Sequence, residues 1–195
     1  MQALPGRLAF ATLYLLLAAC AAAPDRVREQ LDEQTGVTVT RMGKALEFYS
    51  PRPDQGLQAT SFAYLGPLEV NRMGARSTYL WLSVLPGSDA QGRAFEQDAP
   101  RQLRFFIDTE SFEPEIAATA GKQIDLGARA YPRPARWARE IYLSASPELL
   151  GKLATASTLA LEINSGDGEW RRYDLWKPDL EGLRAFVAEI APPAH

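Results

Sequence analysis

Few residue types in this chain could carry out covalent or acid–base chemistry. Its one histidine is His195, the last residue, and its one cysteine is Cys20. A histidine at a chain end has no fixed partner, so histidine-dependent triads and multi-histidine metal sites are excluded. Ser144 and Ser146 lack both a Gly-x-Ser-x-Gly context and an interior histidine to act as a base. We therefore predict no catalytic residue, no metal site and no cofactor.

Two groups of carboxylates are the remaining candidates for chemistry. Glu113 and Glu115 flank a proline and would point to the same side of a strand. An acid–base pair would need one of them desolvated so that it keeps its proton, whereas an exposed pair would protect a sheet edge, which we favour. Ser165, Asp167 and Glu169 could form an oxygen-rich calcium loop. The full calcium-loop pattern is absent, which favours a tight turn.

Aromatic and arginine side chains are the candidates for ligand binding, because an exposed ring stacks on a sugar or peptide while arginine anchors polar groups. The best cluster is Trp170, Arg171, Tyr173 and Trp176, in and just after the last expected strand. For Trp170 and Trp176 a place in the core is the alternative. Further candidates are Trp81, which the core interpretation favours, and Trp137, Tyr64, Tyr79, Arg76, Arg136, Arg139 and Arg172.

The first twenty residues have the pattern of a secretory signal. Arg7 is followed by an uncharged apolar run of about ten residues that ends in small residues before Cys20. Such a run is too short for a hydrocarbon core of roughly 30 Å, which needs about 20 helical residues. It therefore predicts a targeting segment that is removed, not a membrane span.

The four residues Leu17-Ala18-Ala19-Cys20 resemble the lipobox of bacterial lipoproteins. The resemblance implies that the Cys20 thiol carries diacylglycerol, that a further acyl chain such as palmitate can follow, and that Cys20 becomes the mature N-terminus. Two or three chains on one residue hold a protein at a bilayer durably. Ala21 replaces the aspartate that favours retention at the inner membrane, so the resemblance implies the outer membrane facing the periplasm.

Two alternatives to the lipobox remain. The segment could be an ordinary cleavable signal with an incidental cysteine, or a short buried helix with a core cysteine. With the signal removed, the predicted organisation is a signal peptide at residues 1–19, a lipidated cysteine and tether at 20–34, and a single mainly β domain at 35–195.

Composition limits the partners. Removing residues 1–19 takes away Arg7 and leaves 20 Lys+Arg against 24 Asp+Glu. A modestly acidic chain lacks the basic face that nucleic acid requires, so we expect no nucleic-acid partner. With Cys20 lipidated no thiol remains for a disulfide, and the fold depends on its apolar core.

Hydrophobic periodicity and turn residues predict the elements. Residues 35–50 read as a β-hairpin, and the strand at 61–70 is interrupted at Gly66-Pro67, where a bulge or edge position is expected. Residues 122–131 are ambiguous, and 131–134 form an irregular connector. The other expected elements are strands at 77–85, 102–108 and 139–144, a helix from Ser146, a hairpin over 158–175 and a helix from Pro178.

This order predicts a mainly β, α+β class, with an antiparallel β-sandwich-like domain, a short helix and a C-terminal helix. The arrangement from Ile141 to Ile190 also resembles that of several uncharacterised bacterial envelope proteins, which implies a small secreted domain and names no ligand.

The leading functional hypothesis is a non-enzymatic, membrane-anchored envelope lipoprotein that binds another envelope component, a protein or a glycan. A glycan hydrolase that uses two carboxylates is the first alternative. A structural coat lipoprotein without a specific ligand is the second.

Overall fold

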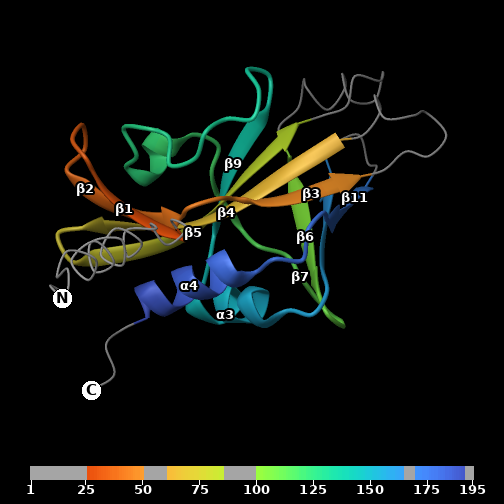
Figure 1. Ribbon diagram of the computed structural model, residues 1–195. Helices are drawn as coiled ribbons and strands as arrows, with labels where there is room; N and C mark the ends of the chain where they lie inside the picture. The colour runs from red at the N-terminus through yellow and green to blue at the C-terminus, as the bar shows by residue number, and fades with distance from the viewer. Residues whose placement is uncertain (1–25, 51–60, 86–99, 165–169, 192–195) are drawn as a thin grey trace, which may run out of the picture.

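The computed structural model describes residues 26–50, 61–85, 100–164 and 170–191 of the chain. Strands and helices follow one another in a long β-rich order (Figure 1). The elements are β1 (Val27–Asp32), β2 (Val37–Met42), β3 (Leu46–Ser50), β4 (Ser61–Arg72), β5 (Ala75–Leu85), β6 (Gln102–Ile107), β7 (Glu110–Phe112), β8 (Ile116–Ala118), the 3₁₀ turn η2 (Gly121–Ile124), β9 (Arg139–Ser144), α3 (Pro147–Thr155), β10 (Leu159–Asn164), β11 (Trp170–Leu175) and α4 (Glu181–Ile190).

The strands form one antiparallel sheet with the order β7-β6-β10-β11-β3-β4-β5-β9-β8. β2 also pairs with β4, and β1 pairs with β2. The predicted mainly β, α+β class is confirmed. All described strands belong to a single sheet. Strands far apart in its order share one apolar cluster, with Leu80 of β5 and Phe105 of β6 among its members.

The strands predicted within residues 35–50 are present, but the hairpin between them is wrong. β2 pairs with β1 and β4, whereas β3 pairs with β4 and β11. Both strands lie along the same edge of β4, where Arg41 is opposite Leu68 and Leu46 is opposite Leu65. A long central strand offers more apolar surface than two short strands offer each other, and the alternating pattern alone does not specify the partner.

The interruption predicted at Gly66-Pro67 is also absent. β4 runs through both residues and pairs with β5 in an unbroken register, so there is no bulge. On the other side neither residue has a strand partner, so the position is locally an edge. Residues 66 and 67 fall between the part of β4 paired with β3 and the part paired with β2. A proline has no N–H to donate, so it is tolerated at this position, where β4 stops pairing with β3 and begins pairing with β2.

The ordered domain begins earlier than residue 35. β1 lies inside the segment 20–34 that the sequence assigns to the tether, and its register with β2 runs from Val27 opposite Met42 to Asp32 opposite Val37. The charged side chains of this segment hid the strand, because β1 is a sheet edge with exposed residues along most of its length.

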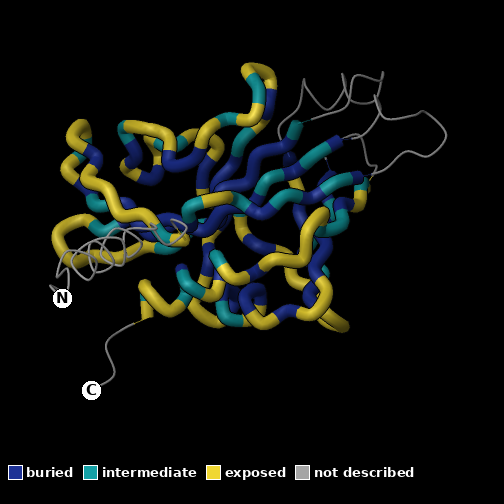
Figure 2. Tube along the Cα trace, viewed as in Figure 1, coloured by how far each residue is buried: buried dark blue, intermediate teal, exposed yellow. Residues whose placement is uncertain are grey.

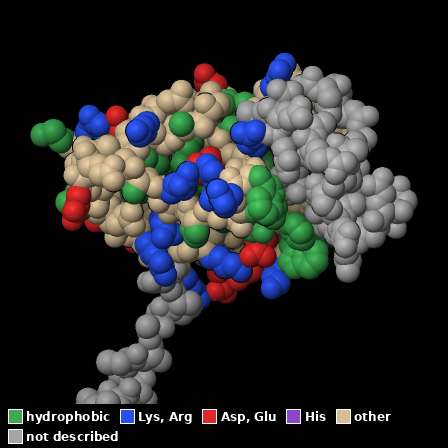
Figure 3. All heavy atoms as spheres, turned by 90° about the horizontal axis from the view of Figure 1, so that it is seen from above, with side chains coloured by type: hydrophobic (Ala, Val, Ile, Leu, Met, Phe, Trp, Pro, Cys, Tyr) green, Lys and Arg blue, Asp and Glu red, His purple; other side chains and the backbone are tan. Residues whose placement is uncertain are grey.

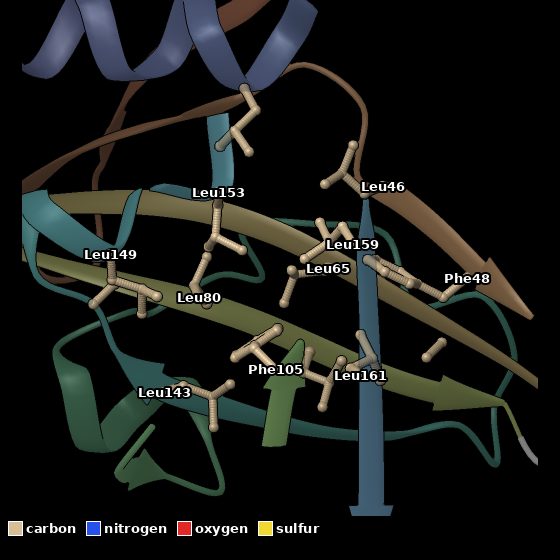
Figure 4. Packing of buried hydrophobic residues seen from close by; sticks show 14 of the residues in the cluster. Leu46, Phe48, Leu65, Leu80, Phe105, Leu143, Leu149, Leu153, Leu159 and Leu161 are labelled. Carbon is tan, nitrogen blue, oxygen red and sulfur yellow. The ribbon is translucent and has the colours of Figure 1, made fainter. Parts of the chain in front are cut away.

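One face of the sheet packs against α3 and α4, which lie side by side on it (Figure 1). Figure 4 shows side chains of the strands, among them Leu65, Leu80 and Phe105, in the same core as Leu149 and Leu153 of α3. The predicted start of α3 is confirmed, with the Ser146 hydroxyl accepting from the Leu149 N–H at 3.1 Å. Neither described helix is long and apolar enough to cross a bilayer.

The opposite face is covered at one end by residues 119–138, the segment that leads from β8 to β9 (Figure 1). A second apolar cluster forms beneath it, with Trp81 and Tyr142 from the sheet and Leu126 and Tyr131 from the segment. The middle of the sheet is therefore buried from both sides, as the dark tube in Figure 2 shows. Residues 119–138 contain no regular element except η2, yet they supply Ile124, Leu126, Ala130 and Tyr131 to this second core.

Candidate functional site

The aromatic residues predicted to bind a ligand do not form one site. Trp170 and Trp176 are exposed by 38% and 49%, but Tyr173 is fully buried in the helix-covered core. Strand alternation explains the difference, because Tyr173 and Arg171 point to the face opposite Trp170. A ligand-stacking role for Tyr173 is therefore wrong. Arg171 donates a 2.7 Å hydrogen bond to the Ser61 hydroxyl.

The two tryptophans have separate surroundings on the sheet. The Trp176 ring lies 4.8 Å from Tyr49 in an edge-to-face contact. The Trp170 ring has the Arg104 guanidinium 4.8 Å above its centre. Trp176 follows β11 and meets Tyr49 of the adjacent β3, whereas Trp170 of β11 meets Arg104 of β6 across the intervening β10, so both rings pack on the sheet surface.

The first predicted carboxylate pair, Glu113 and Glu115, lies on the protein surface. Glu113 is exposed and forms a 2.8 Å ion pair with Arg104, and Glu115 is exposed as well. The exposure of both side chains agrees with the interpretation of Glu113 and Glu115 as a solvated pair that protects a sheet edge. Ser165, Asp167, Glu169 and Cys20 lie outside the described residues.

A large cleft opens between β9 and residues 119–138, on the face turned away from the helices. Its volume is about 1010 Å³. Figure 3 looks onto this face, where basic side chains gather around a hollow. The cleft is lined by Thr119, Ala120, Gly121, Lys122, Gly127, Ala128, Arg129, Arg133, Arg136, Trp137, Ala138, Arg139, Glu140 and Tyr142.

The base of the cleft is rigid because aromatic rings stack beneath it. Tyr131 stacks on Trp81 with ring centres 5.0 Å apart, and its hydroxyl donates to the Pro67 carbonyl at 2.6 Å. The ring occupies the space that a side chain at Gly66 would need, since a Cβ there would overlap the Tyr131 ring. Burial raises the pKa of Tyr142 to about 12, so this lining residue stays neutral.

Glu140 organises the arginines from the centre of the cleft. One carboxylate oxygen accepts from Arg133 at 2.9 Å and from Arg129 at 3.2 Å, and the other accepts from the Trp81 indole at 3.3 Å. Burial by itself would raise the pKa of Glu140, but these hydrogen bonds outweigh it and hold the pKa below its usual value. The carboxylate is therefore ionised and fully engaged.

The cleft has a surplus of positive charge. Among the described residues it is lined by five basic side chains and one acidic one, Glu140. Arg136 is exposed, and within the described part of the chain neither its guanidinium nor the Lys122 ammonium has an ion-pair partner. This surplus stands out in a chain whose net charge is −3, and it makes the cleft a candidate anion-binding site.

The outer wall of the cleft, formed by residues 119–138, is attached to the hairpin of β1 and β2. The Asp32 carboxylate accepts from the N–H groups of Gly127 at 2.7 Å and Ala128 at 3.0 Å, and from Gln34 N–H at 3.0 Å. The bond from Ala128 leads those that hold the pKa of Asp32 below its usual value, although burial opposes them. Arg72 adds a 2.8 Å ion pair to Asp125. The wall is thus fixed at residues 125–128 by charge-assisted contacts with Asp32 of β1 and Arg72 of β4.

Sequence reasoning named Trp137, Arg136 and Arg139 only among scattered candidates and missed the cleft. A signal was present: Arg129, Arg133, Arg136 and Arg139 recur every three or four residues around Trp137 in the proline-containing connector. No regular element indicated that these residues face one another.

Comparison of the chain with protein-family models, with curated proteins and with solved structures finds no match. The functional assignment therefore depends on the geometry of the cleft and on the sequence before residue 26. The guanidinium groups of the cleft can bind an anion through paired hydrogen bonds, and the Trp137 ring can pack against an apolar surface of the same ligand.

Proposed function

We propose that this chain is a non-enzymatic, lipid-anchored protein of the bacterial envelope that binds another envelope component in the arginine-lined cleft. The anchor is diacylglycerol on Cys20, as the lipobox resemblance implies. The observation that carries the binding role is the surplus of basic side chains around Glu140 in a cleft of about 1010 Å³.

The arrangement of carboxylates supports binding over hydrolysis. A glycan hydrolase needs two carboxyl groups roughly 5 to 9 Å apart, one of which keeps its proton. Among the described residues Glu140 is the only carboxylate that lines the cleft, and its pKa is lowered. A purely structural coat protein, in turn, has no use for unpaired cations gathered in one hollow, because such charges repel one another and destabilise the fold.

Lipid anchoring is tested by growing cells with labelled palmitate and fractionating their membranes. The wild-type chain is expected to take up label and to pellet with membranes, and the Cys20→Ser variant to do neither. A Cys20→Ser variant that remains equally bound to membranes would overturn the anchor.

Binding is tested by photo-cross-linking in cells. A photoreactive amino acid in place of exposed Trp137, at the cleft, is compared with one in place of exposed Phe112, in the edge strand β7. We expect a discrete adduct from position 137 and none from position 112. The absence of adducts from both positions would favour the structural coat protein and overturn the binding role.

A further inference from the structure

Three features of the cleft, its charge, its exposed indole and its size, indicate which ligand it accepts. We propose that it binds an anionic saccharide, a sugar that carries phosphate or carboxylate groups. This inference depends on the proposed function, since it names the chemistry of the component that the cleft would bind.

The charge of the cleft calls for a multiply charged ligand. Glu140 neutralises part of the positive charge through Arg129 and Arg133. Within the described residues this leaves Arg136 and Lys122 without an acidic partner. A phosphate dianion matches this remainder better than a single carboxylate does, and the planar guanidinium donates two parallel hydrogen bonds to phosphate oxygens. Glu140 holds the arginine side chains in place before the ligand arrives, which lowers the entropy cost of binding.

Trp137 supplies an apolar surface beside the cations. It lines the cleft and is 57% exposed, whereas tryptophan side chains are highly buried on average. The C–H groups of a sugar ring pack on an indole face while the hydroxyls remain solvated. A tryptophan in the same cleft as the exposed Arg136 guanidinium thus fits a ligand with both a ring and a charge.

The size of the cleft excludes a simple ion as its full occupant. Ligand pockets usually measure about 300 to 1,000 Å³, and this cleft, at about 1010 Å³, is at the upper end of that range. A free phosphate would fill a small part of it and would leave Trp137 unused. A sugar phosphate or a short anionic oligosaccharide would use both.

The ligand class is tested by calorimetric titration of the detergent-solubilised full chain. The probes are glucose 1-phosphate, glucuronate, glucose and inorganic phosphate. We expect glucose 1-phosphate to bind most tightly and glucuronate more weakly, with glucose not binding. Inorganic phosphate is expected to bind at least about tenfold more weakly than glucose 1-phosphate, because it lacks the ring. Equal affinity for the two phosphates would overturn the saccharide assignment.

Variants locate the binding to the cleft. Arg136→Gln removes an exposed guanidinium that has no ion-pair partner among the residues the structure describes. It is expected to weaken glucose 1-phosphate binding about 10- to 100-fold, as the loss of a charged hydrogen bond does. Lys177→Gln removes the same charge outside the cleft and is expected to leave the affinity unchanged.

Trp137→Ala is expected to weaken binding of glucose 1-phosphate but not of inorganic phosphate. Loss of binding in Trp176→Ala, with Trp137→Ala unaffected, would overturn the cleft.

Two further probes separate the source of the ligand from its class. Phosphatidylcholine vesicles with and without a phosphorylated glycolipid distinguish a lipid headgroup from a free saccharide, and binding to either form supports the inference. An acidic peptide that binds with the same Arg136 dependence, while every anionic sugar fails, would overturn the saccharide class. That result would leave the proposed function, an anchored binder of an envelope component, in place.

Discussion

At the scale of single residues, Glu140 explains how so many cations can share one hollow. Its side chain is only 10% exposed, and Arg129 and Arg133 both donate to the same carboxylate oxygen. Without it, these arginines would repel each other in partly desolvated positions. Glu140 therefore positions the arginines.

Replacing Glu140 by Gln is expected to lower the free energy of unfolding by about 1 to 3 kcal/mol at pH 7, the usual cost of losing charged hydrogen bonds. The folded pKa of Glu140 lies below its ordinary value of 4.5, so its contribution is fully present above that pH and declines as the pH falls through the folded pKa. Urea unfolding at pH 7 and pH 3 should therefore show a smaller gap between wild type and Glu140→Gln at the lower pH. An equal gap at both values would contradict this role.

At the scale of elements, the wall formed by residues 119–138 is held by side-chain packing and a small set of polar bonds, without strand pairing. Asp32, at the end of β1, is the main polar attachment, since it accepts from Gly127 and Ala128 N–H groups. A segment with little regular structure and a few decisive bonds opens locally more readily than the sheet beneath it.

The Asp32→Asn variant should release this wall without unfolding the sheet. The amide keeps one acceptor oxygen but loses the charge that strengthens the bonds. Hydrogen exchange at the amides of Gly127 and Ala128 is expected to accelerate about tenfold or more, while amides of β4 and β5 keep wild-type rates. Uniform acceleration across the sheet would show that Asp32 supports the whole fold instead.

Gly66 provides the second attachment of the wall, through close packing. A methyl group there would overlap the Tyr131 ring, so Gly66→Ala is expected to displace that ring from Trp81 and cost about 1 to 3 kcal/mol, as overpacked sites do. Near-ultraviolet circular dichroism should record the lost Trp81–Tyr131 stacking. Gly151→Ala is the matched control: no atom lies within 4 Å of the new methyl group in α3, and alanine there should stabilise by about 0.5 to 1 kcal/mol.

The elements themselves were largely predictable from sequence. Alternation found β5, β6, β9 and the β10–β11 hairpin, and Ser146 marked the start of α3, because both patterns are local. Pairing between distant strands is not local: β2 and β3 each align with β4, and nothing in residues 35–50 specifies that choice. β1 was missed because its exposed edge carries charges in place of alternation.

The cleft was hidden for a related reason. Its arginines lie in an irregular segment whose course is set by contacts with distant residues, such as Asp32 and Pro67. Periodicity reports which side of an element a residue occupies and gives no such information for a connector. The tryptophans near the last strand looked more promising, yet strand alternation buries Tyr173 between them.

At the scale of the whole molecule, the sheet separates two apolar cores that have different structural roles. The larger one, between the sheet and helices α3 and α4, includes the fully buried Phe186. The smaller one supports the cleft. The larger core therefore determines global stability, and the smaller one determines the shape of the candidate site.

Truncating Phe186 to alanine tests this division. The change is expected to lower the free energy of unfolding by about 3 to 5 kcal/mol, the usual cost of deleting a buried aromatic side chain. At temperatures where the variant is still folded, it should retain the ligand affinity of the wild type, as measured by calorimetry. A folded Phe186→Ala protein with lost affinity would show that the two cores are coupled.

If Cys20 carries the proposed lipid, the early start of β1 limits how far the domain can move from the bilayer. From Cys20 to Val27 a fully stretched chain covers at most about 25 Å. β1 then leads towards Asp32, which touches the cleft wall, and a strand of six residues adds about 20 Å. The binding cleft of a protein anchored in this way would reach only the first few nanometres above the bilayer. A saccharide ligand would therefore have to lie within that distance of the membrane.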